Sequence, residues 1–149
     1  MRAVVQRVKS AAVSVNEDLI ASIGRGLVVF VGVGKGDDAG DVEYLVEKIP
    51  HLRIFQDEGE KFNLSLMDVA GEILVISQFT LFGDCRKGRR PSFTEAADHE
   101  YARDLYDHFV SGLEGRGLRV QAGRFQAMMM VNLVNDGPVT LLLDTKKTF

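Results

Sequence analysis

Cysteine is scarce in this sequence, since only Cys85 among the 149 residues carries a thiol. One thiol cannot form a disulfide within the chain. Long apolar runs are missing as well, and no stretch is long enough to span a membrane. The first ten residues, MRAVVQRVKS, lack the apolar stretch and the small-residue cleavage site of a signal peptide. These absences predict a cytoplasmic protein without a membrane partner.

Strong charge of either sign is also absent, because the formal net charge is −3. This balance argues against a general nucleic-acid binder, and we expect no DNA partner, but it does not exclude a local basic patch. The composition, 46% hydrophobic and 26% charged, is ordinary for a globular protein. The length predicts one domain over residues 1–149, which can bury a core without metals or disulfides.

The three histidines, His51, His99 and His108, are far apart in sequence and lie on or beside predicted helices. None has a metal-type spacing with Cys85, and the sequence contains no recognisable Ser-His-Asp set. We therefore predict no metal site and no cofactor, and we interpret Cys85 as an incidental thiol.

Strands dominate the predicted elements. Apolar and β-branched runs predict strands over residues 3–8, 11–15, 27–31, 53–56, 73–81, 118–121, 128–134 and 139–143. In this pattern Met128, Met129 and Met130 form strand core with an alternating outer face, although flexible methionines also suit a pocket wall. The last seven residues, LDTKKTF, are expected to form a partly loose tail.

Two helices accompany these strands. Val42, Leu45, Val46 and Ile49 repeat with helical spacing, after a cap at Asp37 or Asp38 and before Pro50. A second helix is predicted over residues 98–113. Many strands beside two helices predict an α+β domain, with largely antiparallel sheets in a barrel-like, β-β-α layered arrangement.

The segment GVGKGDDAG, residues 32–40, matches a loose dinucleotide fingerprint after a predicted strand. However, Asp37 and Asp38 would repel a pyrophosphate at the helix N-terminus. A phosphate-binding Walker loop is also excluded, because Lys35 is followed by Gly36 instead of Ser or Thr. We predict a flexible loop between a strand and a helix.

A cluster of positive charge interrupts this otherwise acidic chain. It consists of Arg86, Lys87, Arg89 and Arg90. Two interpretations stay open: a loop that only faces water, and a patch that binds nucleic-acid phosphates. The cluster lacks interleaved aromatic residues, so it would hold an RNA backbone without reading bases.

The run ILVISQFTLFGD becomes polar at Ser77 and Gln78 before it resumes at Phe79. On a regular strand Ser77 and Phe79 share one face, whereas Gln78 and Thr80 share the other. One alternative is a strand end whose hydroxyls bond locally. Otherwise the strand breaks there, or backbone N–H groups carry the chemistry.

Two motifs together are specific. SQFTL, residues 77–81, and NDGPVT, residues 135–140, resemble the signature motifs of D-aminoacyl-tRNA deacylases. QRV at 6–8, GRRPSF at 88–93 and GRF at 123–125 are also similar to that family. The resemblance covers essentially the whole chain without a large insertion.

The resemblance implies an enzyme that hydrolyses the ester between a D-amino acid and the terminal adenosine of tRNA. It also implies removal of glycine from the wrong tRNA, and a homodimer with its site at the interface. The matching catalytic residues are Ser77, Gln78, Phe79 and Thr80. Gly137 and Pro138 match the family's Gly-cisPro element, which enters the partner's pocket and selects chirality. We therefore expect a cis bond there.

The implied mechanism needs no side-chain nucleophile. Backbone N–H groups of Phe79 and Thr80 are the natural oxyanion donors for an activated ester, and the ribose 2′-hydroxyl could activate water. Thr80 as nucleophile would need an adjacent base, which the local sequence does not offer. The alternative function is a non-catalytic tRNA-binding module that uses residues 86–90. That alternative does not explain SQFTL together with NDGPVT, and a purely structural dimerisation domain explains neither the motifs nor the basic loop.

Overall fold

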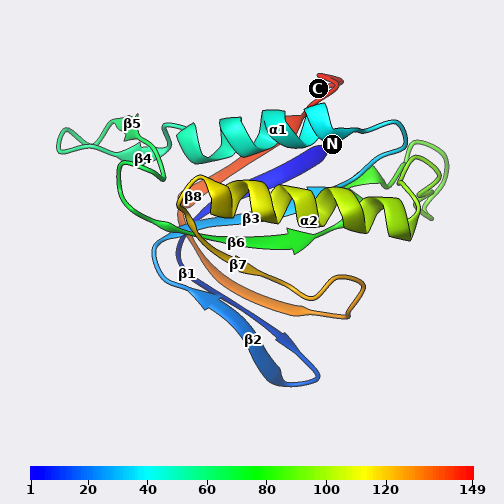
Figure 1. The fold of residues 1–149 in the computed structure, drawn as a ribbon, viewed down its shortest axis with the longest axis horizontal. Coiled ribbons are helices and arrows are strands. Elements are labelled where there is room, and N and C mark those ends of the chain that lie inside the picture. The colour runs from blue at the N-terminus through cyan, green and yellow to red at the C-terminus, as the bar shows by residue number, and fades with distance from the viewer.

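The structure, a computed structural model, describes residues Met1–Phe149. It is built on a six-stranded mixed sheet (Figure 1). Its strands are β1 (Arg2–Val15), β2 (Asp18–Ile23), β3 (Gly26–Gly32), β6 (Glu72–Ser77), β7 (Arg119–Ala122) and β8 (Met130–Asp144). β1 pairs antiparallel with β2, β3 and β8, whereas β3–β6 and β6–β7 are parallel pairs. Because β2 also contacts β7, the sheet almost closes into a barrel.

Two helices, α1 (Ala39–Lys48) and α2 (His99–Gly115), lie side by side over one face of this sheet (Figure 1). Asp38 caps α1 by accepting the N–H groups of Gly40 and Asp41. The helices approach closely at Gly112, where a Cβ atom would come within 2.8 Å of Val46. Both predicted helices and the α+β, barrel-like fold class are confirmed.

The main core lies between the sheet and the helices. It contains fully buried side chains from the sheet and from both helices, such as Val29, Leu45 and Phe109. A smaller apolar cluster lies on the other face of the sheet, inside the barrel-like half, and includes Val13, Val28 and Ile76. Each such side chain contributes about 1.5–3 kcal/mol when it leaves water, so the two clusters fix the sheet between them.

A small hairpin of β4 (Phe55–Gln56) and β5 (Phe62–Leu64) extends beyond the C-terminal end of α1 (Figure 1). Of the strand expected over residues 53–56, only the second half forms, as β4. Between α1 and the hairpin the chain makes one 3₁₀ turn, Ile49–His51, with Pro50 at its start.

The strands predicted over residues 3–8 and 11–15 form one continuous strand, β1. Those predicted over residues 128–134 and 139–143 likewise belong to one strand, β8. β1 runs without a break through Lys9 and Ser10, and β8 continues through the NDGPVT motif. Their mutual register shifts between Gln6 and Val8 and again between Val8 and Ser10. Polar residues at such irregular pairings resemble strand ends in sequence, because a bulge interrupts the period-2 pattern without ending the strand. The prediction of separate strands over residues 128–134 and 139–143 was therefore wrong.

The C-terminal tail is held more firmly than expected. Thr145 N–H donates to the Met1 carbonyl at 2.9 Å, and Lys146 Nζ lies 2.7 Å from an Asp41 carboxylate oxygen. Asp37 is also fixed, since it accepts the Gly34 N–H at 2.6 Å and pairs with the Met1 ammonium at 2.7 Å. These contacts tie down the loop between β3 and α1 that the sequence predicted to be flexible.

Neither helix is both long enough and apolar enough to serve as a membrane span.

Candidate active site

The strand predicted over residues 73–81 ends early, at Ser77. Gln78 N–H still donates to the Val31 carbonyl at 2.8 Å, but the next four residues, Phe79–Phe82, form a 3₁₀ turn. This turn lies directly on β3, because a Cβ atom at Gly32 would come within 2.8 Å of the Gln78 carbonyl oxygen. A Cβ atom at Gly34 would meet the Phe82 ring at 2.5 Å. The glycines of the GVGKG segment thus make room for the turn.

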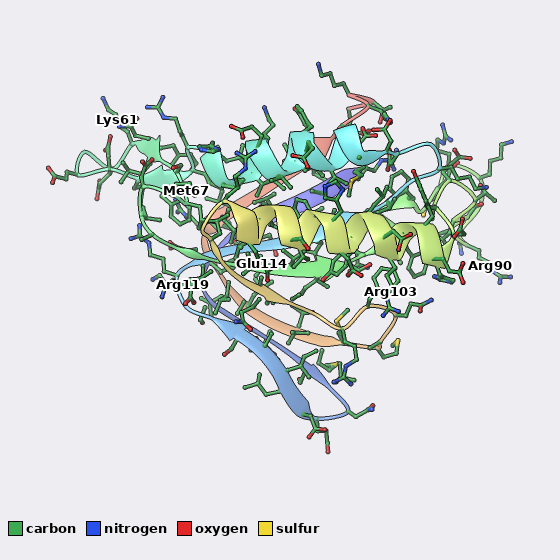
Figure 2. The ribbon with its side chains drawn as sticks, in the orientation of Figure 1. Lys61, Met67, Arg90, Arg103, Glu114 and Arg119 are labelled. Atoms are coloured by element: carbon green, nitrogen blue, oxygen red, sulfur yellow. The ribbon has the colours of Figure 1, made fainter.

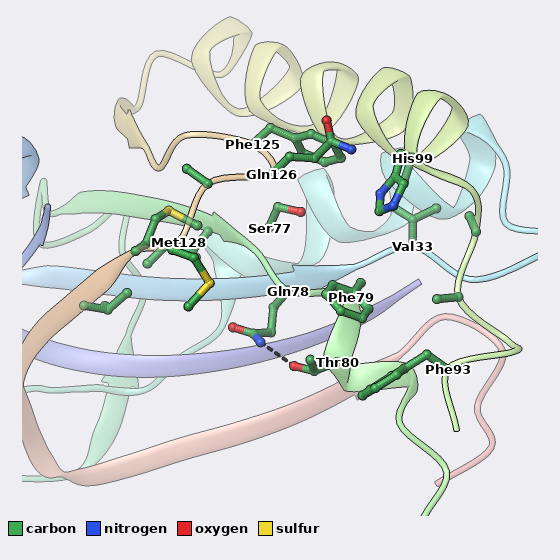
Figure 3. A pocket seen from close by; sticks show the side chains of 17 residues that line it. Val33, Ser77, Gln78, Phe79, Thr80, Phe93, His99, Phe125, Gln126 and Met128 are labelled. Atoms are coloured by element: carbon green, nitrogen blue, oxygen red, sulfur yellow. Dashed lines mark hydrogen bonds between the residues drawn. The ribbon is translucent and has the colours of Figure 1, made fainter. Parts of the chain in front are cut away.

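A cavity of about 740 Å³ opens beside this turn (Figure 3). Its walls come from the end of β6, the 3₁₀ turn, the loop before α2, the first turns of α2 and the β7–β8 loop. Most of its lining is apolar, with Phe79, Phe93 and Phe125 among the large side chains. The volume falls within the range of small-molecule pockets, so the cavity can receive the end of a larger substrate.

All four residues predicted to be catalytic, Ser77, Gln78, Phe79 and Thr80, line this one cavity. A regular strand would have separated them onto two faces, so the break after Ser77 brings them together. Gln78 Nε2 donates a hydrogen bond to Thr80 Oγ1 (Figure 3). The ring of Phe79 packs edge-on against Phe93, with 5.0 Å between their centroids.

The backbone N–H groups of Phe79 and Thr80 lie at the start of the 3₁₀ turn beside the cavity. Phe79 and Thr80 open the 3₁₀ turn, where the first N–H groups have no partner within the turn. Neither group is a donor in the turn, loop and cap hydrogen bonds of the structure. A pair of adjacent, uncommitted N–H groups can stabilise an oxyanion.

The cavity is almost free of ionisable groups. No carboxylate, lysine or arginine lines it, and His99 from the first turn of α2 is its one titratable side chain. The sequence analysis placed His99 on a helix without a role, since the distance of 22 positions between Ser77 and His99 gives no local signal. No group of three or more His, Cys, Asp or Glu side chains is arranged to hold a metal ion.

The three consecutive methionines, Met128, Met129 and Met130, do not all lie in a strand. β8 begins at Met130, so Met128 and Met129 belong to the β7–β8 loop and not to the predicted strand. Both line the cavity, which agrees with the alternative of a pocket wall. Met129 packs on Gly123, where a Cβ atom would come within 2.7 Å of its sulfur. Met128 is 91% exposed.

Gly137 and Pro138 are exposed on β8 and do not line the cavity of their own chain. The peptide bond between them is cis, as expected from the sequence, and Gly137 has a φ of +138°. Arg7 contacts the residue before this element, because its Nε donates to the Asp136 carbonyl at 2.9 Å. The Arg7 side chain is itself fixed by a second bond, from Nη1 to the Ile54 carbonyl at 2.6 Å. Arg7 is only 4% exposed. An arginine inside an apolar strand was the sequence signal for this role.

The basic cluster lies in an exposed loop, and none of its four residues lines the cavity. Arg86 forms an ion pair with Asp84, with 2.7 Å between nitrogen and oxygen. Hydrogen bonds from the Arg86 side chain and backbone lower the pKa of Asp84 to about 2. Lys87, Arg89 and Arg90 have no ion pair in the structure, and Arg90 points away from the body of the molecule (Figure 2). Cys85 is also exposed.

Comparison with known proteins finds matches along almost the entire chain. Residues 4–144 match the family model described as D-Tyr-tRNA(Tyr) deacylase. The chain is 61% identical to the D-aminoacyl-tRNA deacylase of Halothermothrix orenii and 58% identical to that of Thermotoga petrophila, each over the full length of both proteins.

Two solved structures are similar. One, described as c-Myc DNA Unwinding Element Binding Protein, matches with a TM-score of 0.92 and 42% identity, over 97% of this chain and 99% of that one. The other, described as a probable eukaryotic D-amino acid tRNA deacylase, has a TM-score of 0.82 over 95% of this chain and 97% of that one. Its identity of 21% supports the common fold alone.

Proposed function

Because the chain belongs to the D-Tyr-tRNA(Tyr) deacylase family, we propose that the cavity beside Ser77–Thr80 is its active site. The protein is a hydrolase of D-aminoacyl-tRNA, and tRNA is its partner. The observation that carries the location is the pair of N–H groups of Phe79 and Thr80, which open the 3₁₀ turn at the cavity wall and donate in none of the turn, loop and cap hydrogen bonds.

The proposed reaction is direct attack of water on the ester carbonyl carbon. The carbonyl oxygen becomes an oxyanion that accepts hydrogen bonds from the two N–H groups. The bond to the ribose 3′-oxygen then breaks, and that oxygen takes up a proton. The neighbouring 2′-hydroxyl of the RNA relays this proton from the attacking water to the 3′-oxygen. No stronger base is needed, because the aminoacyl ester is activated and positioning supplies much of the rate.

Thr80 is not the nucleophile in this proposal. Its hydroxyl accepts a hydrogen bond from Gln78, and no carboxylate lines the cavity. His99 lines the same cavity but forms no hydrogen bond with Thr80. A threonine nucleophile needs a base within hydrogen-bond reach, so the Gln78–Thr80 pair is better suited to shape the turn.

A symmetric dimer completes the proposed site. The exposed face of β8 carries Met130 at 72%, Val134 at 53% and Leu142 at 66% exposure, together with Gly137 and Pro138. An exposed apolar face of this kind favours burial against another surface. In a two-fold dimer the same face serves both partners, and Gly137–Pro138 of each subunit then enters the cavity of the other.

The Gly137–Pro138 element gives the site its chirality. Its backbone carbonyls hold the α-amino group of the substrate. An L side chain would then point into these carbonyls, whereas a D side chain points away from them. Rejection of the wrong enantiomer is thus built from repulsive contacts. Glycine has no side chain to reject, so the site also accepts glycine attached to the wrong tRNA.

The direct test is to follow ester loss from D-Tyr-tRNA and L-Tyr-tRNA in parallel. We expect hydrolysis of the D ester and survival of the L ester. Loss of both at similar rates would indicate a general esterase. Binding without loss of either would support the alternative, a non-catalytic tRNA-binding module.

Mixed dimers test the shared site. A pocket variant, Phe79→Pro, and an element variant, Gly137→Ala, are each expected to be weak as homodimers. After subunit exchange half of the dimers contain one intact composite site, so we expect about a quarter of wild-type activity. If each subunit holds its complete site, exchange restores nothing.

A further inference from the structure

Two arginines outside the predicted basic cluster lie close to the cavity without lining it, one on α2 and one in the β7–β8 loop. The guanidinium of Arg103 lies over the ring of Phe125, 5.3 Å from its centroid, and that ring lines the cavity. Figure 2 shows Arg103 beside the β7–β8 loop. Arg124 directly precedes Phe125 and is exposed. Arg103 thus contacts a ring that lines the cavity, and Arg124 is the chain neighbour of that ring.

Both arginines lack a carboxylate partner in the structure. For Arg103 this is informative, because Glu100 and Asp107 lie three and four positions away on α2, the spacing at which helical ion pairs form. The side chain turns to Phe125 instead of to either acid. Cation–π contact holds the guanidinium at the rim of the cavity and leaves its N–H groups free for another acceptor.

His99 lies one helical turn before Arg103, on the same face of α2. No carboxylate is among the lining residues, although the exposed acids Asp98 and Glu100 flank His99 at the start of α2. The guanidinium of Arg103, held over Phe125 without a carboxylate partner, is the group at this place that can attract an anion.

We propose that Arg103 and Arg124 bind the phosphodiester that joins the terminal adenosine of the substrate RNA to the nucleotide before it. The inference rests on the proposed function, since it requires the terminal aminoacyl-adenosine to occupy the cavity. Guanidinium groups match the geometry of phosphate oxygens with paired N–H donors. This contact sets the direction from which the RNA reaches the site, along α2 and the β7–β8 loop.

The test compares two short D-Tyr esters, of adenosine and of cytidylyl-adenosine, which differ by one nucleotide and one phosphodiester. For the double variant R103Q/R124Q we expect the ratio of kcat/KM, dinucleotide over nucleoside, to fall about tenfold or more, the effect of losing a charged hydrogen bond. The matched control is R25Q. Arg25 also lies over a phenylalanine, Phe55, at 5.4 Å, but at the opposite end of β3.

An unchanged ratio in R103Q/R124Q, or an equal fall in R25Q, would overturn the proposal. Binding of uncharged tRNA, measured by fluorescence anisotropy against salt, gives a readout that does not depend on catalysis. The slope of log affinity against log salt should decrease by about 0.7 for each lost contact with a single strand, and an unchanged slope also contradicts the proposal. If wild-type protein hydrolyses neither ester but the slope decreases, the proposed function fails and the phosphate contact stands.

Discussion

At the scale of residues, the proposed chemistry depends on the backbone positions of Phe79 and Thr80. Phe79 is the first residue of a 3₁₀ turn, and Gln78 before it has φ −143° and ψ 81°. Proline is tolerated at a first helical position, and Gln78 lies outside the helical region that proline disfavours in the residue before it. The N–H group of Phe79 can therefore be removed without disturbing the turn.

We predict that Phe79→Pro lowers kcat for D-Tyr-tRNA by roughly 10²–10³-fold, the cost of one oxyanion donor. The matched variant Phe79→Ala keeps the N–H group and loses only the ring with its Phe93 contact. Single-turnover kinetics on both variants separates the two effects. Equal losses in the two variants would assign the role to the ring.

Removal of the Thr80 hydroxyl should have a modest effect. We expect Thr80→Ala to retain most of kcat, because the hydroxyl accepts from Gln78 and faces no base. A threonine nucleophile would instead cost most of the rate. A tRNA that ends in 2′-deoxyadenosine, acylated on the 3′ position, should be the poorer substrate. An inactive Thr80→Ala enzyme or rapid hydrolysis of the deoxy ester would contradict the mechanism.

At the scale of elements, the sequence predicted most strands and both helices but not where irregular backbone interrupts them. Hydrophobic periodicity identified α1 and α2 because their buried faces repeat regularly, whereas a continuous apolar run identified β3, which is buried on both faces. The end of β6 depends on the fit of a turn against Gly32 in a different strand, which no local pattern encodes. The motif SQFTL could be assigned to the site only through family resemblance, whereas His99 required the three-dimensional structure.

Gly137 is the position in β8 that should tolerate substitution least. Its φ of +138° is closed to other residues, and a Cβ atom would meet Val139 at 2.7 Å and Arg7 at 3.2 Å. We predict that Gly137→Ala destabilises the protein by about 1–3 kcal/mol, lowers D-Tyr-tRNA hydrolysis and weakens rejection of the L ester. Gly115→Ala, where no atom is in the way, is the control. A Gly137→Ala enzyme with wild-type D/L discrimination would exclude the element from chiral selection.

The basic loop gives a separate prediction. Replacement of Arg86, Lys87, Arg89 and Arg90 by glutamine should weaken binding of all tRNAs alike and reduce the salt slope by roughly one unit or less per contact. Arg86 should contribute least, since Asp84 already neutralises it. Electrophoretic or anisotropy titrations over salt provide the measurement. An unchanged slope in the quadruple variant would mean that the loop only faces water.

At the scale of the whole molecule, the two ends of the chain are joined through buried charge next to α1. Asp41 is 8% exposed and forms an ion pair with Lys146 of the tail. Burial raises the pKa of Asp41, but hydrogen bonds from Lys146 and Thr145 outweigh burial and lower it to about 2. The sequence suggested a loose tail because its polar residues show no periodicity, and the partner of Lys146 lies 105 positions away.

Acid should therefore weaken the fold. A carboxylate whose folded pKa is lowered contributes stability above its unfolded pKa, near 4, and loses it as the pH falls toward 2. We predict that Asp41→Asn costs about 2 kcal/mol at pH 7 and that the difference disappears near pH 2. Urea unfolding at fixed protein concentration, with Asp104→Asn as a surface control, measures it. A difference that does not depend on pH would point to lost packing.

The central position of β1 also has a consequence for how the chain acquires its structure during synthesis. Arg2 pairs with Asp144 and Ser14 with Met130, so the first strand to leave the ribosome needs the last strand as its neighbour. Until β8 emerges, one edge of β1 remains unpaired beside an incomplete core. Contacts of such wide sequence separation slow folding, and an unpaired edge invites association with other chains. The nascent chain is therefore most vulnerable to aggregation just before its final strand docks.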